Sequence, residues 1–107
     1  MDRTSAIALL RSALAQAVEL LVAHGDIHVS HRLTELRTRL EEGDQTALVI
    51  ALSESTGSMG SLQDRYLCPE NGDQIAPSDV VEVNAKLTGL VGSIRLAANA
   101  ALAASNP

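Results

Sequence analysis

Apolar side chains recur at steps of three and four residues through most of this chain, and this spacing predicts helices. In residues 4–24 the stripe consists of Ile7, Leu10, Leu14, Ala17 and Leu21. In residues 29–42 it consists of Val29, Leu33, Leu36 and Leu40. Each set lies on one helical face, because one turn takes about 3.6 residues. Thr4 or Ser5 is expected to cap the first helix and Asp26 or Ser30 the second.

The longest apolar stripe follows Pro77 and predicts a final helix of about 24 residues. Its members are Val80, Val83, Leu87, Leu90, Ile94, Ala97 and Ala101. Pro77 suits a helix start, and Ser78 or Asp79 is expected to provide the cap. Small residues on this helix, Gly89 and Gly92 among them, would let another backbone approach closely. A homodimer formed through the last helix is therefore one expectation.

Residues 44–53 contain the apolar run A-L-V-I-A-L, whose period does not separate a helix from a strand. We predict a helix, because Asp44 is a good N-cap and the chain offers no second strand for pairing. The 107 residues then form one all-α domain, residues 1–107. We expect an antiparallel bundle of about four helices with one long ordered loop before the last helix. The first and last helices should form the long pair, with the middle two packed across them.

Residues 56–77 interrupt the helical pattern and hold the only tyrosine and the only cysteine of the chain. Bends are expected at residues 57–60 and at residues 71–72, where glycine and asparagine favour turns. The apolar residues expected to anchor this loop on the bundle are Leu62, Tyr66, Leu67 and Ile75. An ordered loop of this length is usually functional. The alternative, a structural strap that only satisfies polar groups at helix ends, stays open.

Charge and composition exclude several classes of function. The net charge is −5, and no basic patch is visible, so we expect no nucleic-acid binding. Charged and polar residues such as Arg11 and Gln16 break the apolar runs, so we expect no signal peptide and no membrane span, and we place the protein in the cytoplasm. Cys68 allows no internal disulfide and is a buried apolar group, an intermolecular bridge or a reactive thiol.

Three histidines, His24, His28 and His31, lie close together in the sequence and are the first candidates for metal ligands. However, Gly25 interrupts the helix between them, and no established spacing such as H-E-x-x-H is present. A polar, solvated turn between two helices explains them better than a metal site does. We therefore predict no metal site and no cofactor.

The loop glycines and carboxylates also lack a diagnostic spacing. No G-K-[ST] follows Gly57 and Gly60, so a phosphate cradle is not expected. Asp64, Glu70 and Asp73 do not match the EF-hand pattern. These absences favour a protein without enzymatic activity. The alternative is a small ligand-binding or enzymatic bundle that uses Asp64, Cys68 or the group formed by His24, His28 and His31.

Residues 57–67 read G-S-M-G-S-L-Q-D-R-Y-L and are followed by E-N-G at residues 70–72. This stretch, from Gly57 to Leu67, resembles the G-G-M-G-S-L-N-D-L-x-L motif of a family of small all-helical bacterial proteins of unknown function. Ser58 and Gln63 stand where that motif has Gly and Asn. The resemblance implies helical surroundings and a closing helix, but it implies no activity. Small acidic helical proteins of this kind are similar to immunity proteins, which neutralise bacterial toxins.

These features together predict a protein–protein interaction module, most concretely an immunity-type inhibitor that binds a toxin domain. Acidic groups in residues 57–73 would steer a basic partner, with Arg65 and Tyr66 as anchors. The expected partner-binding residues are Ser61, Gln63, Asp64, Arg65, Tyr66, Glu70 and Asp73.

Overall fold

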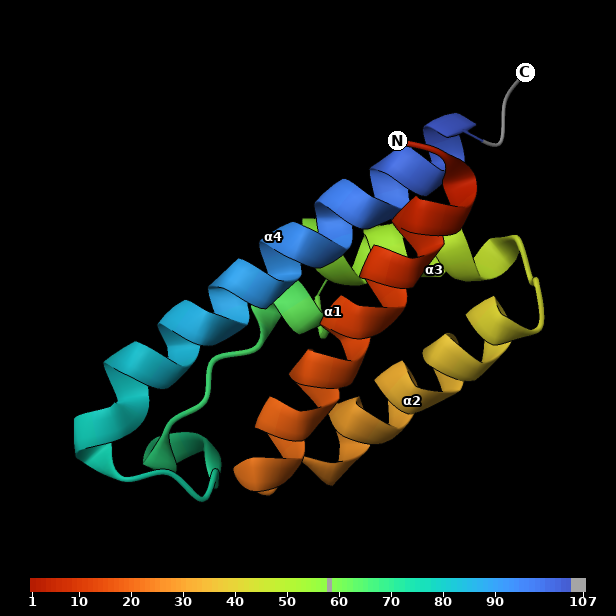
Figure 1. The fold of residues 1–107 in the computed structure, drawn as a ribbon. Coiled ribbons are helices and arrows are strands. Elements are labelled where there is room, and N and C mark those ends of the chain that lie inside the picture. Colours follow the sequence, from red (N-terminus) through yellow and green to blue (C-terminus); the bar gives the residue numbers. More distant parts are fainter. Residues whose placement is uncertain (58, 105–107) are drawn as a thin grey trace.

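A computed structural model describes residues 1–57 and 59–104 and confirms an all-α fold (Figure 1). The four helices of this described part are α1 (Arg3–Ala23), α2 (Ile27–Glu41), α3 (Thr46–Thr56) and α4 (Val80–Ala104). Single 3-10 turns form at Leu62–Asp64, Pro69–Asn71 and Pro77–Asp79. The ambiguous apolar run is thus helical, as predicted. Ser58, one of the two departures from the motif, lies outside the described residues.

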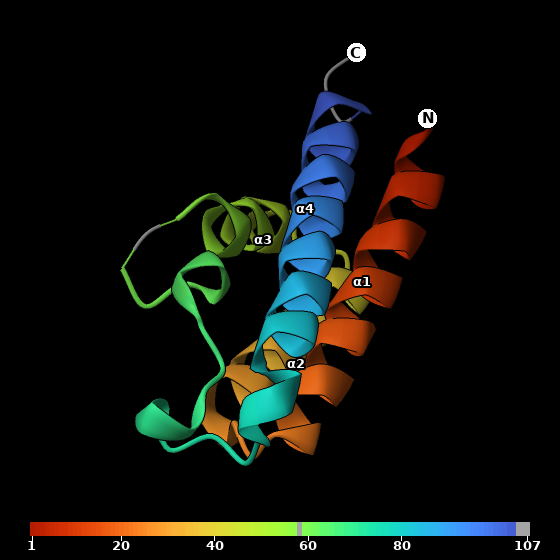
Figure 2. The same cartoon turned by 90° about the vertical axis from the view of Figure 1, so that its left-hand side faces the viewer.

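The helices form two layers (Figures 1 and 2). The long helices α1 and α4 run antiparallel side by side, and the shorter α2 and α3 cover one side of this pair. Helix α1 packs chiefly against α4 and α2, and α4 packs also against α3. This arrangement confirms the expected pairing of the first and last helices, with the middle two across them.

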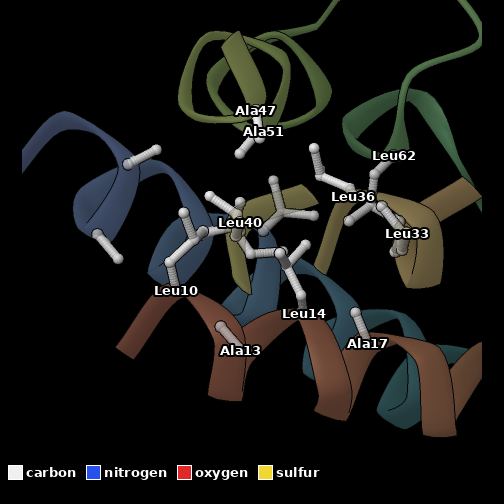
Figure 3. Close-up of a cluster of buried hydrophobic side chains, with 14 of the residues drawn as sticks. Leu10, Ala13, Leu14, Ala17, Leu33, Leu36, Leu40, Ala47, Ala51 and Leu62 are labelled. Carbon is white, nitrogen blue, oxygen red and sulfur yellow. The ribbon is translucent and has the colours of Figure 1, made fainter. Parts of the chain in front are cut away.

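Leucine and alanine side chains fill the space between the layers (Figure 3). The largest fully buried side chains include Leu10, Leu14, Leu33 and Leu48. Each such leucine contributes about 1.5–3 kcal/mol through removal of apolar surface from water. The chain has no Phe and no Trp, so alanines such as Ala51 lie between the leucines. Thin side chains let the helix axes approach closely.

The buried stripe of α4 is rotated relative to the predicted one. Its buried members are Asn84, Leu87, Val91, Ile94, Ala97, Ala98 and Ala101. Val83 and Leu90, which belong to the predicted stripe, are only partly buried. Apolar residues lie on more than one face of α4, so periodicity alone does not decide which face turns inward.

The helix starts agree in part with the predicted caps. Asp26 caps α2, as expected, because its Oδ1 accepts from the Val29 N–H at 2.9 Å. Helix α1 begins one residue before Thr4, and its cap is Asp2, which accepts from the Ser5 N–H at 2.7 Å. The predicted cap of α4 is wrong: residues 78 and 79 lie inside the 3-10 turn that runs directly into that helix.

Candidate functional site

Residues 57–76 lead from α3 to the start of α4 along one side of the bundle (Figure 2). Both predicted bends are present, since Gly57, Gly60 and Gly72 have φ angles of 101°, 78° and 84°. Glycine adopts this left-handed conformation with little steric strain, because it has no Cβ. The segment is therefore an ordered strap with fixed turns at both ends.

Apolar side chains hold the strap on the core. Leu62 and Leu67 are fully buried and Ile75 is partly buried, so three of the four predicted anchors are confirmed. The prediction for Tyr66 is wrong, because its side chain is 52% exposed. Arg65 and Cys68 have extended backbone conformations, and in an extended backbone successive side chains point in opposite directions. Burial of Leu67 thus turns Tyr66 outward.

A buried carboxylate on α3 fixes the first half of the strap. The Glu54 side chain is only 8% exposed, and its Oε1 accepts from the Leu62 N–H at 2.9 Å. Arg32 of α2 binds both carboxylate oxygens and donates from Nη2 to the Gly60 carbonyl at 3.0 Å. The sequence pattern did not indicate this pair. Its only signal is an acidic residue two positions after the apolar run of residues 47–52.

An arginine between two aspartates fixes the middle of the strap. Arg65 donates from Nε to Asp26 Oδ2 at 2.8 Å, from Nη2 to Asp73 Oδ1, and from Nη1 to the Tyr66 carbonyl at 2.7 Å. Burial lowers the pKa of Arg65, but the hydrogen bonds to Asp26 and Asp73 more than offset it, so this pKa lies above its ordinary value. Asp73 also accepts from the Cys68 N–H at 3.0 Å. The guanidinium is therefore satisfied within the chain.

The end of the strap is tied to the turn between α1 and α2. The Gln74 N–H donates to the His24 carbonyl at 2.9 Å, and His24 Nδ1 lies 2.9 Å from the Gln74 carbonyl oxygen. The Asn71 side chain donates to the Tyr66 carbonyl, also at 2.9 Å. His24 thus has a structural partner that the sequence did not indicate.

The predicted partner-binding residues divide into an inward and an outward group. Ser61 is buried, and the Asp73 side chain is only 4% exposed against Arg65. The outward residues are Gln63, Asp64, Tyr66 and Glu70. Asp64 also accepts from the Gly60 N–H at 3.2 Å. Whether the outward group binds a partner stays a prediction.

A shallow hollow lies between the outward side of the strap and the first half of α4. Its lining residues are Gln63, Asp64, Arg65, Tyr66, Val81, Asn84, Ala85 and Thr88. Val81 is 81% exposed. Val81 lies beside the predicted apolar stripe, so the sequence pattern did not mark it as a candidate. The hollow brings the predicted polar set together with an apolar group from α4.

The residues of the alternative enzymatic interpretation do not converge. His31 pairs with Glu35 at 3.1 Å, whereas His28 is exposed. Within residues 1–57 and 59–104, no group of three or more His, Cys, Asp or Glu side chains is placed to hold a metal ion. Cys68 is a free, partly buried thiol.

Comparison with known proteins found no relative of this chain. No family model, no curated protein and no solved structure matches this chain. The resemblance of residues 57–67 to a bacterial motif therefore stays a prediction.

Proposed function

We propose that this chain is a protein-interaction module, most concretely an immunity-type inhibitor that binds and neutralises a bacterial toxin. The observation that carries the proposal is the hollow between residues 63–66 and α4, which exposes Tyr66 and Val81 together. Exposed aromatic and aliphatic groups beside a recess are typical anchors of protein interfaces. Tyrosine is especially suited, since its ring supplies contact area and its hydroxyl a hydrogen bond.

The charge around this hollow supports a basic partner. Residues 62–85 contain one basic side chain, Arg65, and five acidic ones: Asp64, Glu70, Asp73, Asp79 and Glu82. Arg65 is already paired within the chain, so the segment presents a net negative charge to solvent. A negative surface accelerates encounter with a positive cleft and disfavours acidic competitors.

We propose no enzymatic reaction, cofactor or nucleic-acid ligand. The candidate groups of that alternative have structural partners: Asp64 accepts from the Gly60 N–H, and His24 contacts Gln74. No observation gathers them with Cys68 around one recess.

Site-specific photocrosslinking in the source cells tests the proposal. A photoreactive amino acid placed at Tyr66 or at Val81 is expected to give the same discrete adduct with one basic protein. The matched control is Val49 on α3, which is 58% exposed but remote from the hollow in sequence and in element. The double variant Tyr66→Ala/Asp64→Asn is expected to weaken binding of the captured protein by about tenfold or more.

Two outcomes overturn parts of this proposal separately. Equal adducts from residues 49 and 66, or undiminished binding by the double variant, would exclude the hollow as the binding surface. If the captured partner does not arrest growth when expressed alone, or if co-expression of this chain does not restore growth, the immunity role is excluded.

A further inference from the structure

One long face of the bundle has no covering helix among the described residues: the side of the α1/α4 pair that faces away from α2 and α3 (Figure 2). An apolar groove follows this face. Leu9 and Leu96 line one end and are 51% and 71% exposed. The groove continues past Leu90 to the other end, where Glu19 of α1 and Lys86 of α4 lie on its two sides. Exposed leucines in a groove mark an interaction surface.

We propose that this face binds a second copy of the chain about a two-fold axis parallel to α1 and α4. Such an axis lays α4 of one copy over α1 of the other at the same level. Leu9 then meets Leu96, and Glu19 meets Lys86. Because α1 and α4 are antiparallel within one chain, every neighbouring pair in the resulting four-helix core is also antiparallel, the usual arrangement of such bundles. This inference does not depend on the proposed function, which uses another surface.

The charges of Glu19 and Lys86 favour this parallel axis over a two-fold axis perpendicular to the helices, which is the other way to join the two faces. A two-fold axis perpendicular to the helices would place the leucine end of one copy against the charged end of the other. Among the described residues, neither Glu19 nor Lys86 has an ion-pair partner within its own chain. The parallel axis supplies each with an opposite charge from the second copy, and a two-fold axis makes that pairing twice.

The size of the face is sufficient for a stable dimer. Helix α1 has 21 residues, and small side chains such as Ser12, Gly89 and Ser93 beside the groove allow close approach. A face of two adjacent helices is about 30 Å long and about 20 Å wide, hence about 600 Å² per copy. Two copies together would bury about 1,200 Å², the lower bound for specific interfaces.

Lipid is the competing occupant of this face. By length and composition alone, α1 and the helical stretch 77–104 are apolar enough to cross a membrane, and only 33% of each apolar window is buried. A second copy fits better, because Gln16, Glu19 and Lys86 also line the groove. A bilayer would leave these polar groups without partners, whereas a protein interface pairs them.

Analytical ultracentrifugation of the purified full chain across a dilution series tests the proposal. The wild type is expected to show twice the mass of the chain at the higher concentrations. Leu96→Glu is expected to raise the dimer dissociation constant by about tenfold or more, since it buries a charge at the interface. The matched control, Val49→Glu, replaces a comparably exposed residue on α3 and should leave the constant unchanged.

Charge reversal tests the axis. Glu19→Lys and Lys86→Glu should each weaken the dimer, and the double reversal should restore it. A wild type that stays monomeric at every concentration, or a dimer weakened by Val49→Glu but not by Leu96→Glu, overturns the proposal. Failure of the double reversal to restore association overturns the parallel axis. Co-sedimentation of the monomeric chain with vesicles of mixed zwitterionic and anionic phospholipid, lost in Leu96→Glu, would assign the face to lipid instead.

Discussion

The side chain of Asn84 on α4 binds both backbone polar groups of Leu67. Its Oδ1 accepts from the Leu67 N–H at 2.8 Å, and its Nδ2 donates to the Leu67 carbonyl at 2.7 Å. Nδ2 also donates to the carbonyl of Val80, one helical turn earlier, at 2.8 Å. The Asn84 amide thus pairs with the backbone N–H and carbonyl of Leu67, as a neighbouring strand does in a β-sheet. These hydrogen bonds hold the Leu67 side chain in the core.

Replacement of Asn84 by alanine should therefore destabilise the fold. Asn84→Ala leaves the buried N–H and carbonyl of Leu67 unpaired, and we expect the free energy of unfolding to fall by about 2–4 kcal/mol. Urea denaturation measures this change. Asn99→Ala, an exposed position on the same helix, should alter it by no more than about 0.5 kcal/mol. Equal values for the two variants would show that the amide bridge contributes nothing.

The half-exposed Arg32 and the buried Glu54 should behave as a coupled pair. Arg32→Ala leaves the Glu54 carboxylate buried without its counter-charge and should cost about 3 kcal/mol. In Arg32→Ala/Glu54→Gln the second change removes that charge, so the double variant should be more stable than the sum of the single effects predicts. Glu35→Ala breaks an exposed pair with His31 and should cost less than about 1 kcal/mol. Strictly additive single effects would contradict this coupling.

Replacement of Arg65 should strongly destabilise the fold. Arg65→Met leaves Asp26 and Asp73 buried beside each other without a cation, so we expect a loss of about 3–5 kcal/mol. Arg65→Lys should recover only part of this loss, because a single ammonium does not reproduce the planar fork that reaches both carboxylates. Thermal unfolding measures the relative stability of the wild type, Arg65→Met and Arg65→Lys. Full recovery by lysine would mean that charge alone, and not the fork geometry, matters.

Asp44 should make stability depend on pH in the acid range. A hydrogen bond from the Thr46 hydroxyl, and then one from Arg39, lowers its pKa below the ordinary 3.8. The unfolded chain therefore takes up the proton first as the pH falls. The stabilising contribution is present above about pH 4 and is lost progressively below it. Denaturation of Asp44→Asn should show a flatter acid dependence than that of Glu42→Gln, and parallel curves would refute this.

Two glycines should respond to alanine in opposite directions. At Gly57 the φ angle is 101°, a left-handed conformation that strains any residue with a Cβ, so Gly57→Ala should cost about 1–2 kcal/mol. At Gly92, inside α4, an added Cβ meets nothing within 4 Å. Gly92→Ala should therefore stabilise the protein by up to about 1 kcal/mol. Chemical denaturation of both variants provides the comparison, and a stable Gly57→Ala would exclude the strained turn.

Helix positions follow from the sequence because the apolar period and the turn glycines act locally, whereas only one of the caps, Asp26, was predicted correctly. The orientation of α4 does not follow, since valines and leucines surround it and a polar Asn84 on its inner face looks like a surface residue. Glu54 was missed for a related reason: its partners, Arg32 and the Leu62 N–H, come from other elements. The strap was predicted as ordered, with its bends and with Leu62 and Leu67 as anchors. The polar contacts between the strap and the helices could not be predicted from the sequence, because their partners are brought together only by the three-dimensional fold.

Because Glu54, Arg65 and Asn84 hold residues 62–73 by hydrogen bonds within the chain, the exposed hollow has a fixed shape in the folded protein. The conformational entropy of ordering this segment is lost when the chain folds, so association does not incur that cost again. A peptide that copies residues 57–73 should accordingly compete poorly with the intact protein, since it lacks Asp26, Glu54 and Asn84. Under the proposed function, recognition through this surface is expected to be rigid docking and not coupled folding.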